Sequence, residues 1–588
     1  MTREKLVQTA LGKESADLIL ANANILNVFT GEILNADIAI AGGIIAGVGA
    51  YENAPQRIDL SGKYVVPGFI NTHCHVESSM VLPMTYCYEE AHWGVTTLIT
   101  DPHEVANVAG NEGIRFMMNS TRGAPINYYV QLPSCVPCTE FETSGAVLDA
   151  AALAELMPNP DVLGLGEMMD YPGVFSGSPG VYAKLNLASR TYNGPERRGS
   201  PPEKIIDGHA PSISGKELQA YIAAGVATDH ECTTIAEAIE KLRAGMAVLV
   251  REGSACRDLD VLIRGIVENS VDTRRMAFCT DDKHIRDLRR EGSIAYNVKR
   301  SIELGLDTVS AYRMATINAA NIYNLRHLGA IAPGYRADLL ALDNLEKVSI
   351  RHIYKDGKEI DRNAVANPVA PGTCAGLRST EGSPPEGSKN SVHIAPLGPD
   401  SFKLPGGKTQ YPVIEIKPDQ IITGRAVVQA DEVETLRRRG ELCKIAVIER
   451  HRATGNIGVG LLAGYGLRRG AVATTVAHDS HNLIVLGADD ADMRLAAEEI
   501  VRMKGGYVFV SDGKVQGSAA LPVYGLMSDA APDIFTAQLD DLLKKIHAAG
   551  VPKDVEPLIT MSFLALPVIP ELRITDKGLF DVEKFCFI

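Results

Sequence analysis

The feature that most constrains the fold is a unit that recurs about eight times in the middle of the chain. Each unit is a short apolar run that ends in a polar residue, and helix-like patterns lie between several of these runs. The runs are YVVPGFINTHCH, GVTTLITD, INYYVQL, DVLGLGE, KIIDGH, GVATDH, MAVLVR and MAFCTD. Eight strand-then-helix units in about 260 residues predict an α/β protein with a TIM (β/α)8 barrel. A doubly wound open sheet is the alternative, which periodicity alone does not exclude.

The sequence on either side of this region predicts further parts. Short β-type runs broken by Gly, Asn and Asp precede it, and similar runs return after residue 329. A later stretch rich in Pro, Gly and Ser predicts a connector. The predicted parts are a small β-sandwich with an N-terminal extension (1–66 and 329–365), the barrel (67–328), the connector (366–409) and a C-terminal α/β domain (410–588).

Bulk composition narrows the class of partner. The 588-residue chain has a formal net charge of −14, which argues against nucleic acid or an anionic membrane, because both require clustered Lys and Arg. The chain start carries no apolar signal sequence, and no apolar run reaches the length of a membrane span. Ten scattered cysteines do not form a disulfide framework. We expect a cytoplasmic protein without a membrane partner that forms a homo-oligomer, with a dimer favoured.

Side chains at the ends of the predicted strands are of metal-ligand type. His73 and His75 lie two residues apart, so in a strand both imidazoles face the same side. His209 and His230 are separated by about one strand-helix unit and are expected at the same height on neighbouring strands. Each histidine alone fits a buried core residue, but the two pairs together predict two metal positions at one mouth of the barrel. The other strand ends carry Asp101, Gln131, Glu167, Arg251 and Asp281.

At these positions the chain resembles the amidohydrolase superfamily. Members with two metals carry H-x-H on strand 1, a bridging carboxylate on strand 4, histidines on strands 5 and 6 and an aspartate on strand 8. The segments GFINTHCHVESSM, TDPHEVANV, PSCVP, GLGEMM, DGHAP and CTDDKH are similar to the adenine deaminase family, as is RATGNIGVGLLAGYGLRRGAVATTVAHDSHNLIVLG near the carboxyl end. The resemblance extends over almost the whole chain. It implies the metal ligands His73, His75, Glu167, His209, His230 and Asp281.

Two departures from the superfamily pattern concern the metal site. Many members have Asp two residues before the first histidine, where this chain has Asn71, so the support of His73 is open. Many also bridge the metals with a carboxylated lysine, where this chain offers Glu167. Nitrogen and oxygen ligands without thiolate suit two divalent ions, either manganese or iron(II), with zinc as a further candidate.

The resemblance implies a small purine base, adenine, as substrate, and hypoxanthine and ammonia as products. A water between two divalent cations loses a proton readily and attacks as hydroxide. Asp281 is expected to bind one metal and to accept the proton of that water. Glu77 follows His75 by two residues, so in an extended strand it faces the same side. It can protonate or hydrogen-bond a ring nitrogen, and support of a metal ligand is the equal alternative.

Contacts to the purine are expected from loops after strands 2 and 8. The candidates are Asp101, His103, Glu104, Asp282 and His284. Ordinary loop or helix capping is the alternative for each of them. His478 and His481 of HDSHN lie in the C-terminal region and either close over the site, bind a further ion or serve the structure, and the structural role is favoured.

Other functions fit parts of the sequence. The same ligands would serve a cyclic amide hydrolase of the hydantoinase or dihydroorotase type, and only the flanking motifs and the extra domain separate the two activities. A non-catalytic binding protein on this fold would be expected to have lost ligands. A zinc deaminase pattern, H-x-E with P-C-x-x-C, fails because Ser134 separates Pro133 from Cys135.

Overall fold

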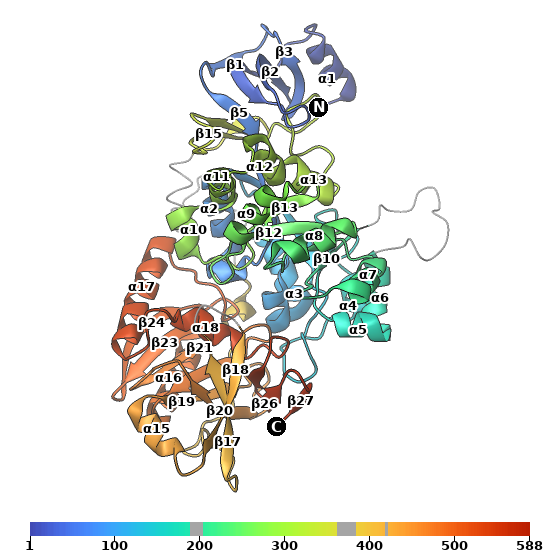
Figure 1. The fold of residues 1–588 in the computed structure, drawn as a ribbon. Helices are drawn as coiled ribbons and strands as arrows, with labels where there is room; N and C mark the ends of the chain where they lie inside the picture. Colours follow the sequence, from blue (N-terminus) through green and yellow to red (C-terminus); the bar gives the residue numbers. More distant parts are fainter. Residues whose placement is uncertain (189–203, 362–383, 418–421) are drawn as a thin grey trace.

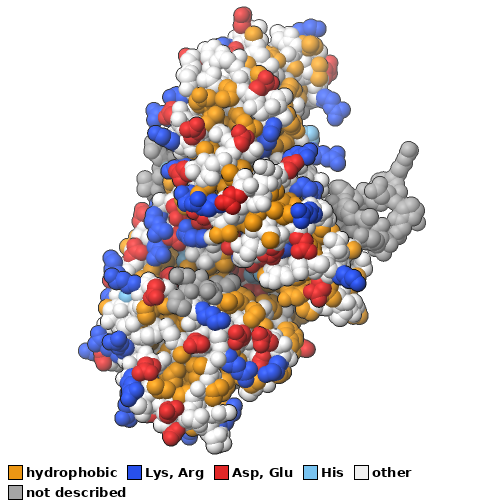
Figure 2. Space-filling view, in the orientation of Figure 1, with side chains coloured by type: hydrophobic (Ala, Val, Ile, Leu, Met, Phe, Trp, Pro, Cys, Tyr) orange, Lys and Arg blue, Asp and Glu red, His pale blue; other side chains and the backbone are white. Residues whose placement is uncertain are grey.

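A computed structural model describes residues 1–188, 204–361, 384–417 and 422–588. An N-terminal sheet, a central barrel and a C-terminal domain follow one another along the long axis of the molecule (Figure 1). Within the described ranges no helix is both long enough and apolar enough to cross a bilayer. On the face shown in Figure 2, acidic and basic side chains are interspersed.

Eight parallel strands form the barrel, and they coincide with the eight predicted apolar runs. They are β6 (Phe69–Cys74), β7 (Val95–Thr100), β8 (Asn127–Leu132), β9 (Val162–Met168), β10 (Ile205–Gly208), β11 (Thr228–Asp229), β12 (Ala247–Arg251) and β13 (Met276–Cys279). One ladder runs β10-β9-β8-β7-β6 and the other β11-β12-β13. The Ala227 amide donates to the Ile206 carbonyl (2.9 Å), and the Asp281 amide donates to the His73 carbonyl (3.0 Å), so both gaps between the ladders are bridged. The predicted α/β barrel is confirmed.

Helices follow the barrel strands in the chain. They are α2 (Pro83–His92), α3 (His103–Ser120), α4 (Ala150–Ala154), α5 (Tyr171–Ser176), α6 (Pro179–Ala188), α7 (Gly215–Ala223), α8 (Ile235–Arg243), α9 (Leu259–Asn269), α10 (Ile285–Glu291), α11 (Ile294–Glu303), α12 (Thr308–Ala315) and α13 (Ile317–Ile322). Every residue of β7 and β12 is buried, as expected for parallel strands covered on both faces.

Strands from both flanks of the barrel share one mixed sheet. Its members are β1 (Leu18–Leu26), β2 (Ile33–Ala41), β3 (Ile44–Gly49), β4 (Gln56–Asp59), β5 (Tyr64–Pro67), β14 (Leu339–Leu342), β15 (Ile350–Lys355) and β16 (Lys358–Glu359), next to α1 (Arg3–Ala10). The two flanks meet where β5 pairs antiparallel with β14, with Val66 opposite Leu340. The domain limits drawn from the sequence stay a prediction.

The C-terminal part is a second α/β unit. Its elements are β17 (Gln410–Ile416), β18 (Thr423–Gln429), α15 (Val433–Arg439), β19 (Leu442–Ile448), β20 (Ile457–Ala463), β21 (Ala471–Thr474), β22 (Leu483–Gly487), α16 (Asp490–Met503), β23 (Gly506–Ser511), β24 (Lys514–Ala520), α17 (Pro532–Ala548), α18 (Pro557–Phe563), β25 (Leu572–Thr575), β26 (Gly578–Asp581) and β27 (Cys586–Phe587). The large sheet runs β18-β17-β20-β19-β22-β21-β23-β24, and β25-β26-β27 form a small one. Residues 366–383 of the predicted connector lie outside the described residues.

The barrel and the C-terminal domain share a hydrophobic core. Val76 and Ile285 of the barrel belong to the same buried cluster as Ile445 and Leu539 of the C-terminal domain. The backbone also crosses the boundary, since the Ser528 amide donates to the Met80 carbonyl (2.8 Å). The C-terminal domain therefore packs against the segment that directly follows β6.

A buried ion pair holds the loops that carry His209 and His230. Lys241 of α8 is fully buried, and its ammonium donates to Asp229 Oδ2 (2.9 Å) and to the Ala210 carbonyl (2.7 Å). Asp229 Oδ1 accepts the Ala210 amide (2.8 Å). Because both charges are buried and hydrogen-bonded, removing one leaves the other uncompensated.

We expect Lys241→Met to lower the free energy of unfolding by about 3–5 kcal/mol, because the Asp229 carboxylate loses its cation. Chemical denaturation followed by circular dichroism measures the change. Lys216→Met on the exposed face of α7 is the matched control and should stay within about 0.5 kcal/mol of the parent. Equal stability of the two variants would contradict the buried network.

Candidate active site

Four predicted ligands converge where β6, β9 and β13 end. His75 Nε2 lies 3.0 Å from Glu167 Oε1 and 3.2 Å from Asp281 Oδ1. His73 Nε2 lies 3.3 Å from Glu167 Oε1 and 3.2 Å from His75 Nε2. A divalent ion with bonds of about 2.1 Å places its ligand atoms roughly 3.0–3.5 Å apart. The spacing therefore fits one shared cation.

The second oxygen of Glu167 faces a second group of imidazoles. Glu167 Oε2 is 2.8 Å from His209 Nδ1 and 3.6 Å from His230 Nε2. Glu167 Oε1 is buried, and its nearest imidazole nitrogens are His75 Nε2 at 3.0 Å and His73 Nε2 at 3.3 Å. One carboxylate thus presents its two oxygens to two sets of nitrogen donors, which is the arrangement a bridging ligand requires.

Neighbouring charges keep the central carboxylates ionised. Burial alone would raise the pKa of Glu167, but the charge of His230 and hydrogen bonds from His209 and His73 hold it well below its ordinary value. Burial opposes ionisation of Asp281 too, yet the hydrogen bond from His75 and the charges of His230 and Arg251 hold its pKa well below its ordinary value. Ionised carboxylates are the form that binds divalent cations.

The backbone after β13 aims Asp281 at the cluster. Asp281 adopts a left-handed conformation (φ 54°), which Asp tolerates better than most residues. Its Oδ2 accepts from Arg251 Nη1 (3.2 Å), which leaves Oδ1 toward His75. Asn71 contributes nearby, because its amide nitrogen donates to Thr280 Oγ1 (2.7 Å) and its amide oxygen accepts the Thr280 amide (3.2 Å). Asn71 thus ties β6 to the residue before Asp281.

Asp101, at the end of β7, supports two of the predicted ligands. Its backbone carbonyl accepts a hydrogen bond from His75 Nδ1 (2.9 Å), and this donation leaves the Nε2 lone pair toward the cluster. Its Oδ2 accepts the Glu167 amide (2.9 Å). These contacts favour a positioning role over the purine contact expected from the sequence.

Glu77 reaches the site by a different path from the expected one. The strand does not stay extended, because β6 ends at Cys74 and a 3-10 turn (η1, Glu77–Ser79) follows. Glu77 Oε1 accepts the Val105 amide (3.1 Å) near the start of α3. Glu77 Oε2 is buried without a hydrogen-bond partner among the described residues. Burial and the nearby charge of Glu104 raise the pKa of Glu77 to about 8, which favours a protonated carboxyl at neutral pH.

The remaining candidates line the same region. His103 Nδ1 lies 3.7 Å from Glu167 Oε1, beside the predicted ligands. Ser78 Oγ is within hydrogen-bond distance of both Glu104 Oε1 (2.7 Å) and Asp282 Oδ1, which joins the loops after β6, β7 and β13. His284 precedes α10, where its amide donates to Ser254 Oγ (3.0 Å), and burial lowers its pKa to about 4.

The C-terminal segment His478–His481 meets this region. His478 Nδ1 is 3.4 Å from Glu104 Oε1, and His481 Nε2 is 3.9 Å from Glu104 Oε2. Asp479 Oδ1 is 3.9 Å from His103 Nε2. The sequence analysis gave closure of HDSHN over the site as one alternative but favoured a structural role, because no pattern near HDSHN relates it to a strand end.

Glu231 is a residue of the site that the sequence analysis missed. Its Oε1 lies 3.3 Å from His230 Nε2 and 3.5 Å from His209 Nδ1, and it forms an ion pair with Arg251. Burial opposes its ionisation, but the charge of Arg251 keeps its pKa below the ordinary value. Glu231 directly follows His230, so alternation along a strand would point it away. It turns inward because β11 ends at Asp229.

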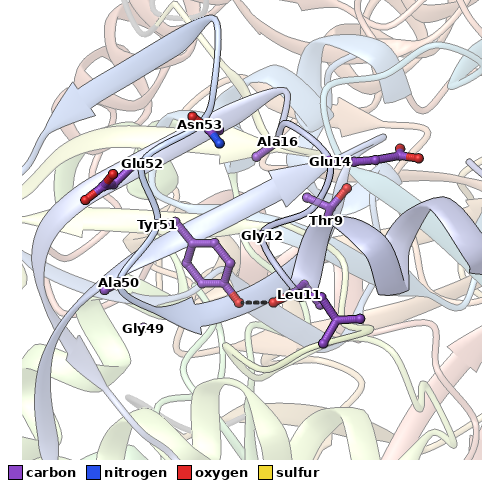
Figure 3. Close-up of a pocket in the computed structure, with 11 residues that line it drawn as sticks. Thr9, Leu11, Gly12, Glu14, Ala16, Gly49, Ala50, Tyr51, Glu52 and Asn53 are labelled. Carbon is purple, nitrogen blue, oxygen red and sulfur yellow. Dashed lines mark hydrogen bonds between the residues drawn. The ribbon is translucent and has the colours of Figure 1, made fainter.

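A separate hollow of about 340 Å³ lies beside the N-terminal sheet. It is open and lies between the end of α1 and the loop after β3, where the Tyr51 hydroxyl donates to the Ala10 carbonyl (3.0 Å; Figure 3). The N-terminal sheet is at the far end of the molecule from the C-terminal domain (Figure 1). The predicted ligands therefore do not line this hollow.

Comparisons with known proteins agree with this architecture. The amidohydrolase family model matches residues 64–361, and the adenine deaminase C-terminal domain model matches residues 420–586. An adenine deaminase of Desulfitobacterium hafniense (strain Y51) is 43% identical over 587 residues, covering 100% of this chain and 98% of the relative. Adenine deaminase 2 of Carboxydothermus hydrogenoformans is 44% identical over 587 residues, covering 99% of this chain and 98% of the relative.

An adenine deaminase of Clostridium acetobutylicum is 44% identical over 589 residues, covering 100% of this chain and 99% of the relative. Membership of the amidohydrolase family implies a divalent metal site, and the clustered His, Asp and Glu side chains suit one. Because the similarity runs through both the barrel and the C-terminal domain, the chain belongs to the adenine deaminase family within the amidohydrolases.

Proposed function

We propose that the protein is a metal-dependent hydrolase that converts adenine and water to hypoxanthine and ammonia. The observation that carries the proposal is Glu167, whose two oxygens face separate groups of imidazoles at the barrel mouth. Similarity to adenine deaminases over the full chain length supports adenine as the substrate.

The donor set suits two divalent cations. His73, His75 and Asp281 would hold one ion, His209 and His230 the other, with Glu167 between them. Manganese and iron(II) fit these nitrogen and oxygen donors best, and zinc also fits, since thiolate is absent from the set. When bound, the ions would supply Lewis acidity and lower the pKa of a water molecule to near neutrality.

The protein side chains would move the protons. The reaction forms a C6–O bond and breaks the C6–N6 bond of adenine. Asp281 accepts a proton from the attacking water and passes it to the N6 amine, which leaves as ammonia. Glu77 donates its proton to the ring nitrogen next to C6 and recovers one from the new hydroxyl group. Hypoxanthine therefore leaves with a C6 carbonyl and a ring N–H, and both carboxyl groups return to their starting state.

The proposal is tested by reconstituting the protein with manganese or iron(II) and assaying ammonia release from adenine. A cyclic amide such as dihydroorotate, assayed in parallel, represents the amide hydrolase alternative. We expect release of ammonia from adenine and no opening of the amide. Turnover of the amide alone would reverse the assignment, and turnover of neither by the metal-loaded protein would refute it.

We expect Glu167→Gln to lower both metal content and rate, because a neutral amide is a poor bridging ligand. The turnover number should fall by about 10³-fold or more, since cation stabilisation of the transition state is worth several kcal/mol. Metal analysis and ammonia release measure the two effects. Glu112→Gln on the exposed side of α3 is the matched control. Unchanged metal content and rate in Glu167→Gln would contradict the bridging role.

We expect Glu77→Gln to keep its metals but to lower the turnover number by about 10²- to 10⁴-fold, the usual contribution of a positioned proton donor. The amide can still hydrogen-bond a ring nitrogen, so the Michaelis constant should change little. Steady-state kinetics with metal analysis separate the two effects. A variant that loses its metals would instead assign Glu77 to metal binding.

The cytoplasmic location and the dimer stay predictions from the sequence.

A further inference from the structure

We propose that the C-terminal segment His478–His481 recognises the imidazole half of the purine, with Asp479 accepting the ring N–H that a free base carries and a nucleoside lacks. The inference rests on the proposed function and assigns a specificity role to a part of the chain outside the barrel. Asp479 is the specificity-determining residue, and His481 is the neighbouring hydrogen-bond donor.

The position of the segment supports this role. One imidazole ring, that of His103, lies between Glu167 and Asp479, with 3.7 Å from Nδ1 to Glu167 Oε1 and 3.9 Å from Nε2 to Asp479 Oδ1. The reacting carbon of adenine belongs to the six-membered ring. With that carbon at the predicted ligands, the five-membered ring extends away from them, toward the segment.

Buried polar atoms without hydrogen-bond partners are present both in the barrel loop and in the segment. Glu77 Oε2, Asp479 Oδ2 and His481 Nε2 have no hydrogen-bond partner within the described part of the chain. All three side chains are nearly inaccessible, with exposed fractions of 1%, 3% and 0%. Buried polar groups are satisfied in native proteins, so the cluster calls for a polar ligand with both donor and acceptor groups.

The tautomer of His481 decides whether a metal ion or an organic ligand can bind next to its Nε2. Its Nδ1 accepts the Ala477 amide (3.2 Å), so the proton of the neutral ring resides on Nε2. A protonated Nε2 cannot bind a cation, although Glu104, His478 and His481 have the spacing of a metal site. It can donate to a lone pair, such as that of a purine nitrogen. Burial and the charge of His478 hold the pKa of His481 well below its ordinary value, which agrees with a neutral ring.

Glu142 and the Cys138 thiol lie near Asp479. Burial and the charge of Asp479 raise the pKa of Glu142 and of the Cys138 thiol well above their ordinary values, so both are neutral. Asp479 Oδ2 has no hydrogen-bond partner among the described residues, so a purine N–H would suit it. A ribosyl group on that nitrogen would replace the proton. It would also clash with the packed interface between the barrel and the C-terminal domain.

The C-terminal domain holds the segment in place before any ligand binds. The His478 ring stacks on Phe563 at 4.6 Å, and the His478 amide donates to the Ser562 carbonyl (2.8 Å). The fully buried Arg450 donates to the His481 carbonyl and to the Tyr524 carbonyl (3.2 Å). A segment that is preorganised in this way suits discrimination between closely related substrates.

The test compares adenine with 9-methyladenine, which lacks the ring N–H, as substrates and as competitive inhibitors of the metal-loaded protein. We expect Asp479→Ala to lower kcat/KM for adenine at least tenfold, mainly through KM. Its activity toward 9-methyladenine should stay within about threefold of the parent or rise, so selectivity falls. Asp431→Ala, at an exposed position, is the matched control and should leave both substrates unchanged.

An equal loss on both substrates would assign Asp479 a structural role and overturn the inference, as would no loss on adenine. If Asp479→Ala fails to fold, Asp479→Asn keeps the shape and should shift selectivity in the same direction by a smaller factor. A third equivalent of manganese in the parent that is lost in His481→Gln would favour a metal site and also overturn it. A metal-loaded parent inactive on adenine would instead refute the proposed function, and this inference with it.

Discussion

The site depends on one carboxylate that would be unfavourable to bury by itself. Glu167 is 4% exposed, and it stays ionised only because imidazoles face both of its oxygens. Those imidazoles come from the ends of three strands, β6, β10 and β11, so the carboxylate is stabilised only when the barrel is complete. Closure of the barrel and assembly of the site are therefore the same structural event.

The C-terminal domain is part of that assembly. It shares a buried cluster with the segment after β6 and brings HDSHN against His103 and Glu104. TIM barrels place their chemistry at the carboxyl ends of the strands and in the loops that follow them, and loops are more mobile than the elements that they connect. In this chain the added domain supports these loops and contributes polar groups of its own.

The barrel strands and the ligand set were predictable because both signals are local. A buried strand and the polar residue at its end lie in one short stretch, and parallel packing brings such ends together. Glu77, Glu231 and Asp479 lie beyond this kind of reasoning. A 3-10 turn redirects Glu77 and the early end of β11 redirects Glu231, while Asp479 approaches His103 through a domain contact between segments distant in sequence. Backbone turns after a strand and packing between domains leave no periodic pattern.

The pairing of Val66 with Leu340 joins two strands between which the whole barrel is threaded. During synthesis β1 to β5 leave the ribosome long before β14 exists, so β5 presents an open edge while residues 68–338 are still being made. The N-terminal sheet can be completed only after the barrel returns the chain to its starting point. Folding of the end made first thus waits on residues made much later, and a nascent chain halted within the barrel would carry an unpaired, aggregation-prone strand.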